Sequence, residues 1–94
     1  MKAILLLRER VVLSERSFAE LRIWRVPRSV RGSEHAFKYA LALVVDRVCV
    51  LRYDNEAGKG DHRHVGEMEE RYVFTTPERL IADFWNDVDR WRPS

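Results

Sequence analysis

The sequence predicts an α+β domain, in which an antiparallel sheet of about four or five strands is covered by a C-terminal α-helix. Two observations support this prediction. Runs of leucine, β-branched and aromatic residues follow one another at hairpin spacing, and one amphipathic helical pattern follows them at the end of the chain. Strands in hairpin order followed by a helix are typical of α+β proteins. The 94 residues have the length of one domain, which we expect to span residues 1–94.

Four segments have the composition of strands. They are residues 2–13, 18–26, 37–45 and 48–53. The first is interrupted by charges at residues 8–10 and could also form a short helix, but a strand is favoured. In the second segment Ala19, Leu21 and Ile23 share one face, opposite Glu20 and Arg22, which predicts a half-buried strand. A further short strand is expected at residues 72–74.

The third and fourth segments are separated only by Asp46-Arg47, the spacing of a two-residue hairpin. The tight turn of this kind places both central residues at positive φ, so Arg47 is expected to bear strain. The only cysteine, Cys49, lies in an apolar run of this hairpin and is expected to be a small core residue. A single cysteine excludes a disulfide framework and a cysteine-based metal site.

Thr76-Pro77 opens the predicted helix, which runs from residue 77 to about residue 90. Thr76 has the side chain of an N-cap, Pro77 suits the first helical position, and Glu78 suits the positive end of the helix dipole. The apolar residues that follow recur at helical spacing. They are Leu80, Ile81, Phe84, Trp85 and Val88, of which Leu80, Phe84 and Trp85 are expected to be buried.

The composition is that of a globular protein, with 46% hydrophobic and 34% charged residues, which excludes disorder and collagen. The longest apolar stretch, residues 39–45, is far shorter than the roughly 20 residues that cross a bilayer. The apolar residues near the start are interrupted by charges before they reach the length of a secretory signal. We therefore expect a cytoplasmic protein.

Positive charge is concentrated early in the chain. Residues 1–38 carry nine Lys/Arg against four Asp/Glu, whereas residues 39–94 carry eight against eleven. A basic segment of this kind predicts contact with nucleic-acid phosphates, although a solvated strand face and a basic loop would show the same pattern. The candidate phosphate-binding residues are Arg22, Arg25, Arg28, Arg31 and Lys38.

The segment between residues 54 and 71 is expected to be a long functional loop, because structureless loops of this length are uncommon in compact domains. Gly58-Lys59-Gly60 allows positive φ and a close approach to a ligand, so it is a candidate phosphate cradle. It is not a Walker loop, because the GxxxxGK[ST] pattern is absent.

His62 and His64 follow in the same segment, and an extended backbone would point both rings to one face. Histidine changes charge near neutral pH, so these rings are candidates for the general acid–base chemistry that RNA cleavage by the 2′-hydroxyl requires. Candidate partners are Lys59 and Arg63, which would hold phosphate charge, and Asp54 and Asp61, which would orient or tune the histidines.

Two other interpretations of this segment stay open. His-x-His with Asp54 or Asp61 could bind a metal ion, although His-x-His alone is a weak metal signal. The histidines could also be ordinary surface residues of a long loop.

A distinctive pattern runs through residues 38–45, 48–56 and 58–64, above all YDNE-x-GKGDHRH from Tyr53 to His64, and continues with Asp83-Phe84-Trp85 in the helix. In this pattern the chain resembles the TumE family of small bacterial toxin–antitoxin proteins. Arg47 stands where relatives commonly have glycine. The resemblance implies the toxin of a two-gene module, with an antitoxin partner that is typically a helix-turn-helix protein.

Taken together, these observations predict a toxin that acts on RNA as a metal-independent endoribonuclease without a cofactor. A homodimer is a further expectation. The alternatives are a non-catalytic protein that binds a nucleic acid or a partner, and a metal-dependent nuclease.

Overall fold

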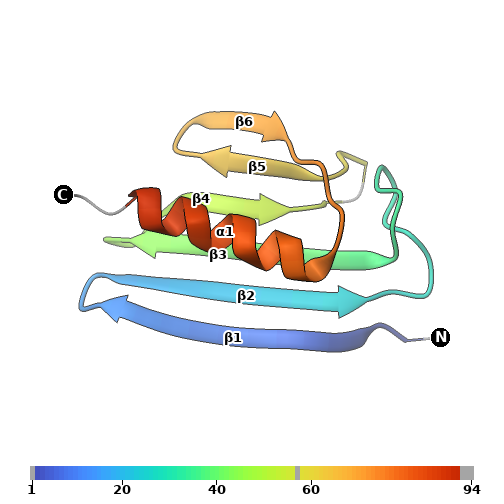
Figure 1. Cartoon of the computed structure of the whole chain (residues 1–94), viewed down its shortest axis with the longest axis horizontal. Helices are drawn as coiled ribbons and strands as arrows, with labels where there is room; N and C mark the ends of the chain where they lie inside the picture. Colours follow the sequence, from blue (N-terminus) through green and yellow to red (C-terminus); the bar gives the residue numbers. More distant parts are fainter. Residues whose placement is uncertain (1, 57, 92–94) are drawn as a thin grey trace.

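The computed structural model describes residues 2–56 and 58–91, which form six strands followed by one helix. The elements are β1 (Ile4–Ser14), β2 (Ser17–Arg25), β3 (Phe37–Val45), β4 (Val48–Asp54), β5 (His62–Val65), β6 (Met68–Arg71) and α1 (Pro77–Trp91). Each strand pairs antiparallel with the next, so the sheet order follows the chain order (Figure 1). The α+β class is confirmed, but the expected four or five strands are wrong, because the sheet has six.

The extra strands, β5 and β6, lie where the sequence predicted a loop. They form a hairpin that turns at Gly66, whose φ is 60°, whereas the strand expected at residues 72–74 is not present. This hairpin lacks the alternation of apolar residues because it lies at the edge of the sheet, where charged side chains can remain on both faces. Ion pairs across the hairpin, such as Arg63 with Glu70, replace apolar packing.

The β3–β4 turn has the expected geometry. Asp46 and Arg47 have φ values of 50° and 68°, the positive values that the two-residue turn demands. Two residues other than glycine in this conformation cost about 1 kcal/mol or more each. The Asp46 N–H partly offsets this cost by donating to the Arg16 carbonyl oxygen at 2.8 Å.

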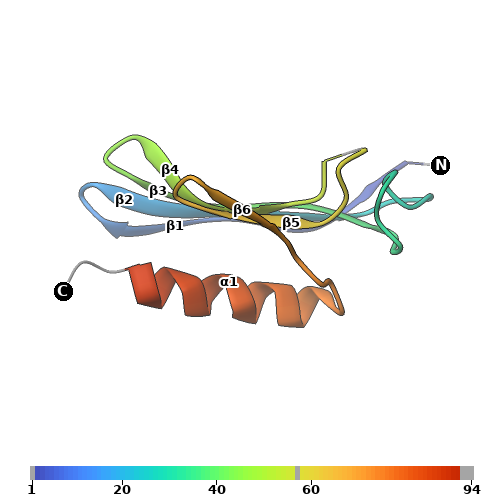
Figure 2. The same cartoon turned by 90° about the horizontal axis from the view of Figure 1, so that it is seen from above.

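Helix α1 lies across one face of the sheet and encloses the core (Figure 2). Thr76 caps it as expected, since its Oγ1 accepts the Arg79 N–H at 3.1 Å. The core residues come from three strands and the helix. They are Ala19, Leu21, Ile23, Tyr39, Leu41, Leu43, Leu51, Tyr53, Leu80, Phe84 and Val88.

Two burial predictions need correction. Trp85 is only half-buried. Phe84 lies at the centre of the helix face that contacts the sheet, and Trp85 lies at the margin of that face. Cys49 is exposed and not a core residue. The register shifts between Leu43 and Val44, so Cys49 lies opposite Val44 on the face of the sheet away from the helix.

The opposite face of the sheet is not covered by any helix or strand within the described residues (Figure 2). We call it the open face. Because successive side chains of a strand alternate, it presents the residues that lie between the core positions of each strand. Within the described residues, no helix combines the length and the apolar character that crossing a membrane requires.

Candidate functional site

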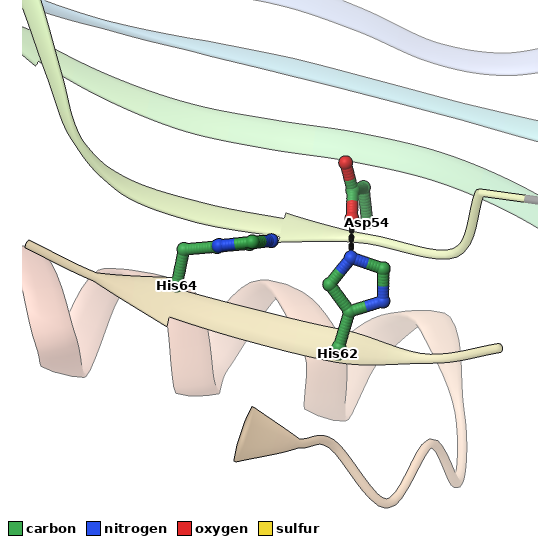
Figure 3. Close-up of side chains that lie close together, drawn as sticks. All are labelled: Asp54, His62 and His64. Atoms are coloured by element: carbon green, nitrogen blue, oxygen red, sulfur yellow. Dashed lines mark ion pairs between the residues drawn. The ribbon is translucent and has the colours of Figure 1, made fainter. Parts of the chain in front are cut away.

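The candidate site lies on the open face, where β4 and β5 pair. In this pairing Asp54 lies opposite His62, and Arg52 lies opposite His64. The core positions Leu51 and Tyr53 face the helix, so Arg52 and Asp54 face outward, and both histidines share that side. Figure 3 shows Asp54, His62 and His64 gathered over the two strands, and we call these three residues the Asp54–His62–His64 cluster.

His62 is the buried member of the cluster, with 4% of its surface exposed. Its Nδ1 lies 2.9 Å from the Gly60 carbonyl oxygen. That oxygen can only accept a hydrogen bond, so Nδ1 carries a proton and Nε2 is directed toward Asp54. Nε2 lies 2.8 Å from Asp54 Oδ1, a contact that is attractive when the ring carries its second proton (Figure 3).

Asp54 is also buried, and its two oxygens have different surroundings. Oδ2 accepts from Arg52 Nε at 2.7 Å and lies 2.6 Å from Arg52 Nη2. Oδ1 is buried and receives no directed hydrogen bond from the described residues, although Nε2 of His62 is close to it. The carboxylate therefore lies between a guanidinium and an imidazole, with one oxygen available to a further cation or donor.

His64 is the accessible member, since one third of its side chain is exposed. Its ring centre lies 4.9 Å from that of His62, in an edge-to-face arrangement. Glu69 of β6 reaches toward both rings, with Oε2 3.9 Å from His64 Nδ1 and Oε1 4.0 Å from His62 Nε2. A substrate on the open face would therefore meet His64 first, with His62 and Asp54 behind it.

This arrangement permits two kinds of chemistry. An exposed imidazole supported by a buried imidazole–carboxylate pair can move protons at neutral pH. In addition, one ligand atom from each of Asp54, His62 and His64 lies within 4.8 Å of the others, a separation that could hold one metal ion. The contact of His62 Nδ1 with a carbonyl would also orient the ring as a metal ligand.

Asp61 belongs to a different cluster. Its Oδ2 accepts from the Tyr39 hydroxyl at 2.7 Å and lies 2.6 Å from His35 Nε2, and its Oδ1 accepts from the Ser33 hydroxyl at 2.5 Å. The Phe37 N–H donates to His35 Nδ1 at 3.2 Å, so Nε2 carries the proton and donates to Asp61. Asp61 thus joins the segment after β2 to the segment before β5.

Burial, together with the hydrogen bond to Asp61, raises the pKa of Tyr39 above the ordinary value for tyrosine. This hydroxyl therefore remains a hydrogen-bond donor through the physiological pH range. Phe74 stacks on His35 with ring centres 3.8 Å apart, which closes the cluster on another side.

Arg63 points to the helix side of the sheet, away from the histidines. It pairs with Asp87 of α1 at 2.8 Å and with Glu70 of β6. The Tyr53 hydroxyl also donates to Asp87, and burial followed by this hydrogen bond raises the pKa of Tyr53. The nearby Tyr53 hydroxyl and the Asp87 carboxylate raise the pKa of Arg63, so the guanidinium keeps its charge and anchors α1 to β5.

Gly58 and Gly60 have positive φ values of 89° and 77°, as a phosphate cradle would require. The close approach, however, is to the chain itself, because a Cβ on Gly60 would lie 2.7 Å from the Gly32 carbonyl oxygen. The Gly58 N–H donates to the Arg31 carbonyl oxygen at 2.7 Å. Lys59 is exposed on this loop, with Nζ 3.8 Å from Glu56.

The five basic candidates do not lie on one surface. Arg22 and Lys38 alternate with core positions, so they face the open side of the sheet. Arg25 is an even number of residues from the core positions Leu21 and Ile23, so it lies on the helix side. Arg28 and Arg31 are exposed in the connection between β2 and β3. The structure therefore divides the basic segment into a sheet portion and a loop portion.

Sequence reasoning missed two residues beside the cluster, Arg52 and Glu69. The signal for Arg52 was its position two residues before Asp54, which places both on one face of a strand. No such signal existed for Glu69, because its strand was not predicted.

The comparisons with known proteins give one result. The family model described as Toxin TumE matches residues 2–92. Among curated proteins and among solved structures, no significant match was found.

Proposed function

The chain belongs to the TumE toxin family, and from this premise we propose that it cuts RNA as a metal-independent endoribonuclease. Membership indicates the toxin of a toxin–antitoxin system, which has an antitoxin as its partner. The observation that carries the proposal is the partly exposed His64 beside the buried pair of His62 and Asp54 on the open face. We propose that it acts on RNA in the cytoplasm.

In the proposed reaction, His64 accepts the proton of the RNA 2′-hydroxyl while the 2′-oxygen attacks the adjacent phosphorus. The bond from phosphorus to the 5′-oxygen breaks, and that leaving oxygen takes a proton from a water molecule on its own side of the phosphorus, while His64 later releases its proton to solvent. The products are a 2′,3′-cyclic phosphate and a free 5′-hydroxyl, with no net change in protons. The partly exposed ring therefore supplies the general base, and solvent supplies the acid.

The neighbouring residues support this ring. Arg52 lies opposite His64 with half of its side chain exposed, so its guanidinium can stabilise charge on the phosphorane. His62 and Asp54 act as positioning residues. Their buried contact fixes the His62 ring, and the His64 ring packs against that ring. Glu69 favours the orientation of His64 from the other side.

The remaining candidates have different roles in the proposal. Asp61 and Arg63 maintain the site by joining chain segments, Asp61 through Ser33 and Arg63 through helix α1. Lys59, on its exposed loop, contributes a cation for the phosphates of the bound RNA.

A metal-dependent nuclease is the second candidate function. It is favoured by the three ligand atoms within 4.8 Å and by Asp54 Oδ1, which lacks a directed donor. Against it, the Arg52 guanidinium already neutralises this carboxylate at 2.6 Å. A chelator separates the two, because it would abolish only the metal-dependent reaction.

We also propose an antitoxin of the helix-turn-helix class, as the family resemblance implies, and a homodimer formed through β1. The two sheet edges differ, since β6 consists of Met-Glu-Glu-Arg whereas β1 exposes Ile4, Leu5 and Leu6. Charged residues protect an edge from pairing, and long apolar edges invite it. Sedimentation of the purified chain tests the dimer. The unaltered chain should sediment as a dimer, and Leu5→Lys, which places a charge on the β1 edge, should sediment as a monomer.

The decisive experiment incubates the purified protein with RNA and resolves the products. We expect cleavage that persists in EDTA, leaves cyclic phosphate ends, and fails when the 2′-hydroxyl next to the cut is absent. Binding without products would instead support a non-catalytic binding protein. Loss of cleavage in EDTA, restored by a divalent ion, would support the metal-dependent alternative.

A further inference from the structure

The open face carries two continuous rows of side chains that cross all six strands. The strand register defines them, because each residue is paired with the next along its row. The first row is Arg8, Arg22, Ala40, Asp54, His62 and Arg71, and the second is Arg10, Glu20, Ala42, Arg52, His64 and Glu69. The Asp54–His62–His64 cluster is thus part of a surface that extends across the sheet.

The centre of both rows is occupied by small side chains. Ala40 is exposed and Ala42 is half-buried, although β3 is an inner strand of the sheet, where larger β-branched or aromatic side chains are usual. Their methyl groups form a low floor, in which Ala40 lies between Arg22 and Asp54 and Ala42 lies between Glu20 and Arg52. This floor gives an extended ligand access to the backbone level of the sheet.

The β1–β2 end of this surface is positively charged. Arg8 and Arg22 are paired directly across two strands, an arrangement of like charges that destabilises a sheet. Arg22 has Glu20 at 3.8 Å, while Arg8 takes part in no ion pair with the residues that the structure describes. A bound anion would relieve this repulsion.

An aromatic side chain lies beside these charges. Trp24 is half-buried on the open face, and its register partner on β3 is Lys38. An indole next to a cation is the combination on which a nucleotide can stack its base and place its phosphate.

We propose that the open face binds single-stranded RNA across the strands, from Arg8 and Arg22 over Ala40 and Ala42 to His64. This inference rests on the proposed function, because it assigns the substrate path to the same site. Neighbouring strands are about 4.8 Å apart, so β1 to β5 spans about 19 Å. At about 3.4 Å per stacked nucleotide, this length accommodates roughly six nucleotides.

A single strand fits this surface better than a duplex. Its bases are free to stack on Trp24 and its phosphates can follow the arginines, as in other proteins that bind single strands on a sheet face. The reaction also needs the ribose next to the cut to rotate until the 2′-oxygen is in line with the leaving oxygen, and paired bases in a helix resist that rotation.

The test measures binding separately from cleavage. The probe is a fluorescent 2′-O-methyl oligonucleotide of roughly six residues, the length inferred from the strand spacing, which cannot be cleaved by this mechanism. Its binding is followed by anisotropy at several salt concentrations. The Arg8→Ala/Arg22→Ala variant is compared with Arg25→Ala, which removes an exposed arginine of the same strand on the opposite face.

We expect the double variant to bind about tenfold or more weakly and to lower the salt slope by about 1.4, or 0.7 for each lost contact to a single strand. Arg25→Ala should bind as the unaltered protein does, because Arg25, although the sequence made it a phosphate-binding candidate, lies on the helix side of the sheet and outside the proposed path. Ala40→Trp, which fills the exposed floor, should also weaken binding. The circular dichroism of each variant establishes that the fold is retained.

Equal losses for Arg25→Ala and for the double variant would overturn the inference, as would tighter binding of a duplex of the same sequence. Retained cleavage and binding in the folded double variant would also overturn it while leaving the proposed nuclease intact. Conversely, binding that depends on Arg8 and Arg22 without any cleavage of unmodified RNA would support the path and refute the proposed nuclease.

Discussion

The two histidines of the cluster should respond differently to replacement by alanine. Replacing His64 should lower the cleavage rate alone, whereas replacing His62 should lower both the cleavage rate and the stability of the fold. His64 is partly exposed, and the ion-pair contact that it makes, with Glu69, is long at 3.9 Å. His64→Ala should therefore change the free energy of unfolding by less than about 1 kcal/mol. It should nevertheless lower the cleavage rate by roughly 10²–10⁴-fold, because it removes the group that moves the proton.

His62→Ala should affect both quantities. It removes the hydrogen bond to the Gly60 carbonyl and leaves the buried Asp54 carboxylate with Arg52 as its remaining close cation. Breaking a buried charged contact costs about 3–5 kcal/mol, and the exposed half of the Arg52 side chain places the expected loss near the lower end. Cleavage should fall by roughly 10²–10⁴-fold as well, since His64 loses its support.

Urea denaturation gives the stability and product formation gives the rate. The rates are compared at a temperature where both variants are folded, and His62→Gln serves as a partial replacement that keeps a hydrogen-bonding group. If His62→Ala were as stable as the unaltered protein, the buried contact with Asp54 would be wrong. If folded His64→Ala cleaved RNA at the full rate, the active site would lie elsewhere.

Four other outcomes can be measured. Phe84→Ala should cost about 3–5 kcal/mol in urea denaturation, because this fully buried ring holds α1 to the sheet, whereas a loss below 1 kcal/mol would contradict that packing. Lys59→Ala should weaken RNA binding as well as cleavage, and an unchanged affinity would exclude Lys59 from the interface. Neutralising both Arg28 and Arg31 should lower the salt dependence of binding, and an unchanged slope would remove this loop from RNA contact. Folding raises the pKa of three phenols above the unfolded value of about 10. Above pH 10 the unfolded chain therefore loses these protons first, so the free energy of unfolding should fall there and be unaffected by the tyrosines at lower pH. Tyrosinate absorbance should appear together with unfolding for these residues, which are Tyr39, Tyr53 and Tyr72.

The elements that the sequence predicted well depend on local chemistry. Thr76-Pro77 determines where the helix begins, and Asp46-Arg47 determines the tight turn, because caps and two-residue turns involve only neighbouring residues. The β5–β6 hairpin was missed for a physical reason. Its stabilising contacts are ion pairs such as Arg63 with Glu70, which leave no apolar alternation in the sequence.

The sequence by itself determined which chemical groups the protein has near residue 60 and that two histidines would share a face. It did not distinguish Asp54 from Asp61 as the partner of those histidines, since both lie near them in the chain. Only the tertiary structure decided this. Leu51 and Tyr53 must face the helix to fill the core, and this requirement sets the register that brings Asp54 to His62. Asp61 precedes β5 and is instead held by Ser33, a residue 28 positions earlier, through a contact that forms only when the two loops meet.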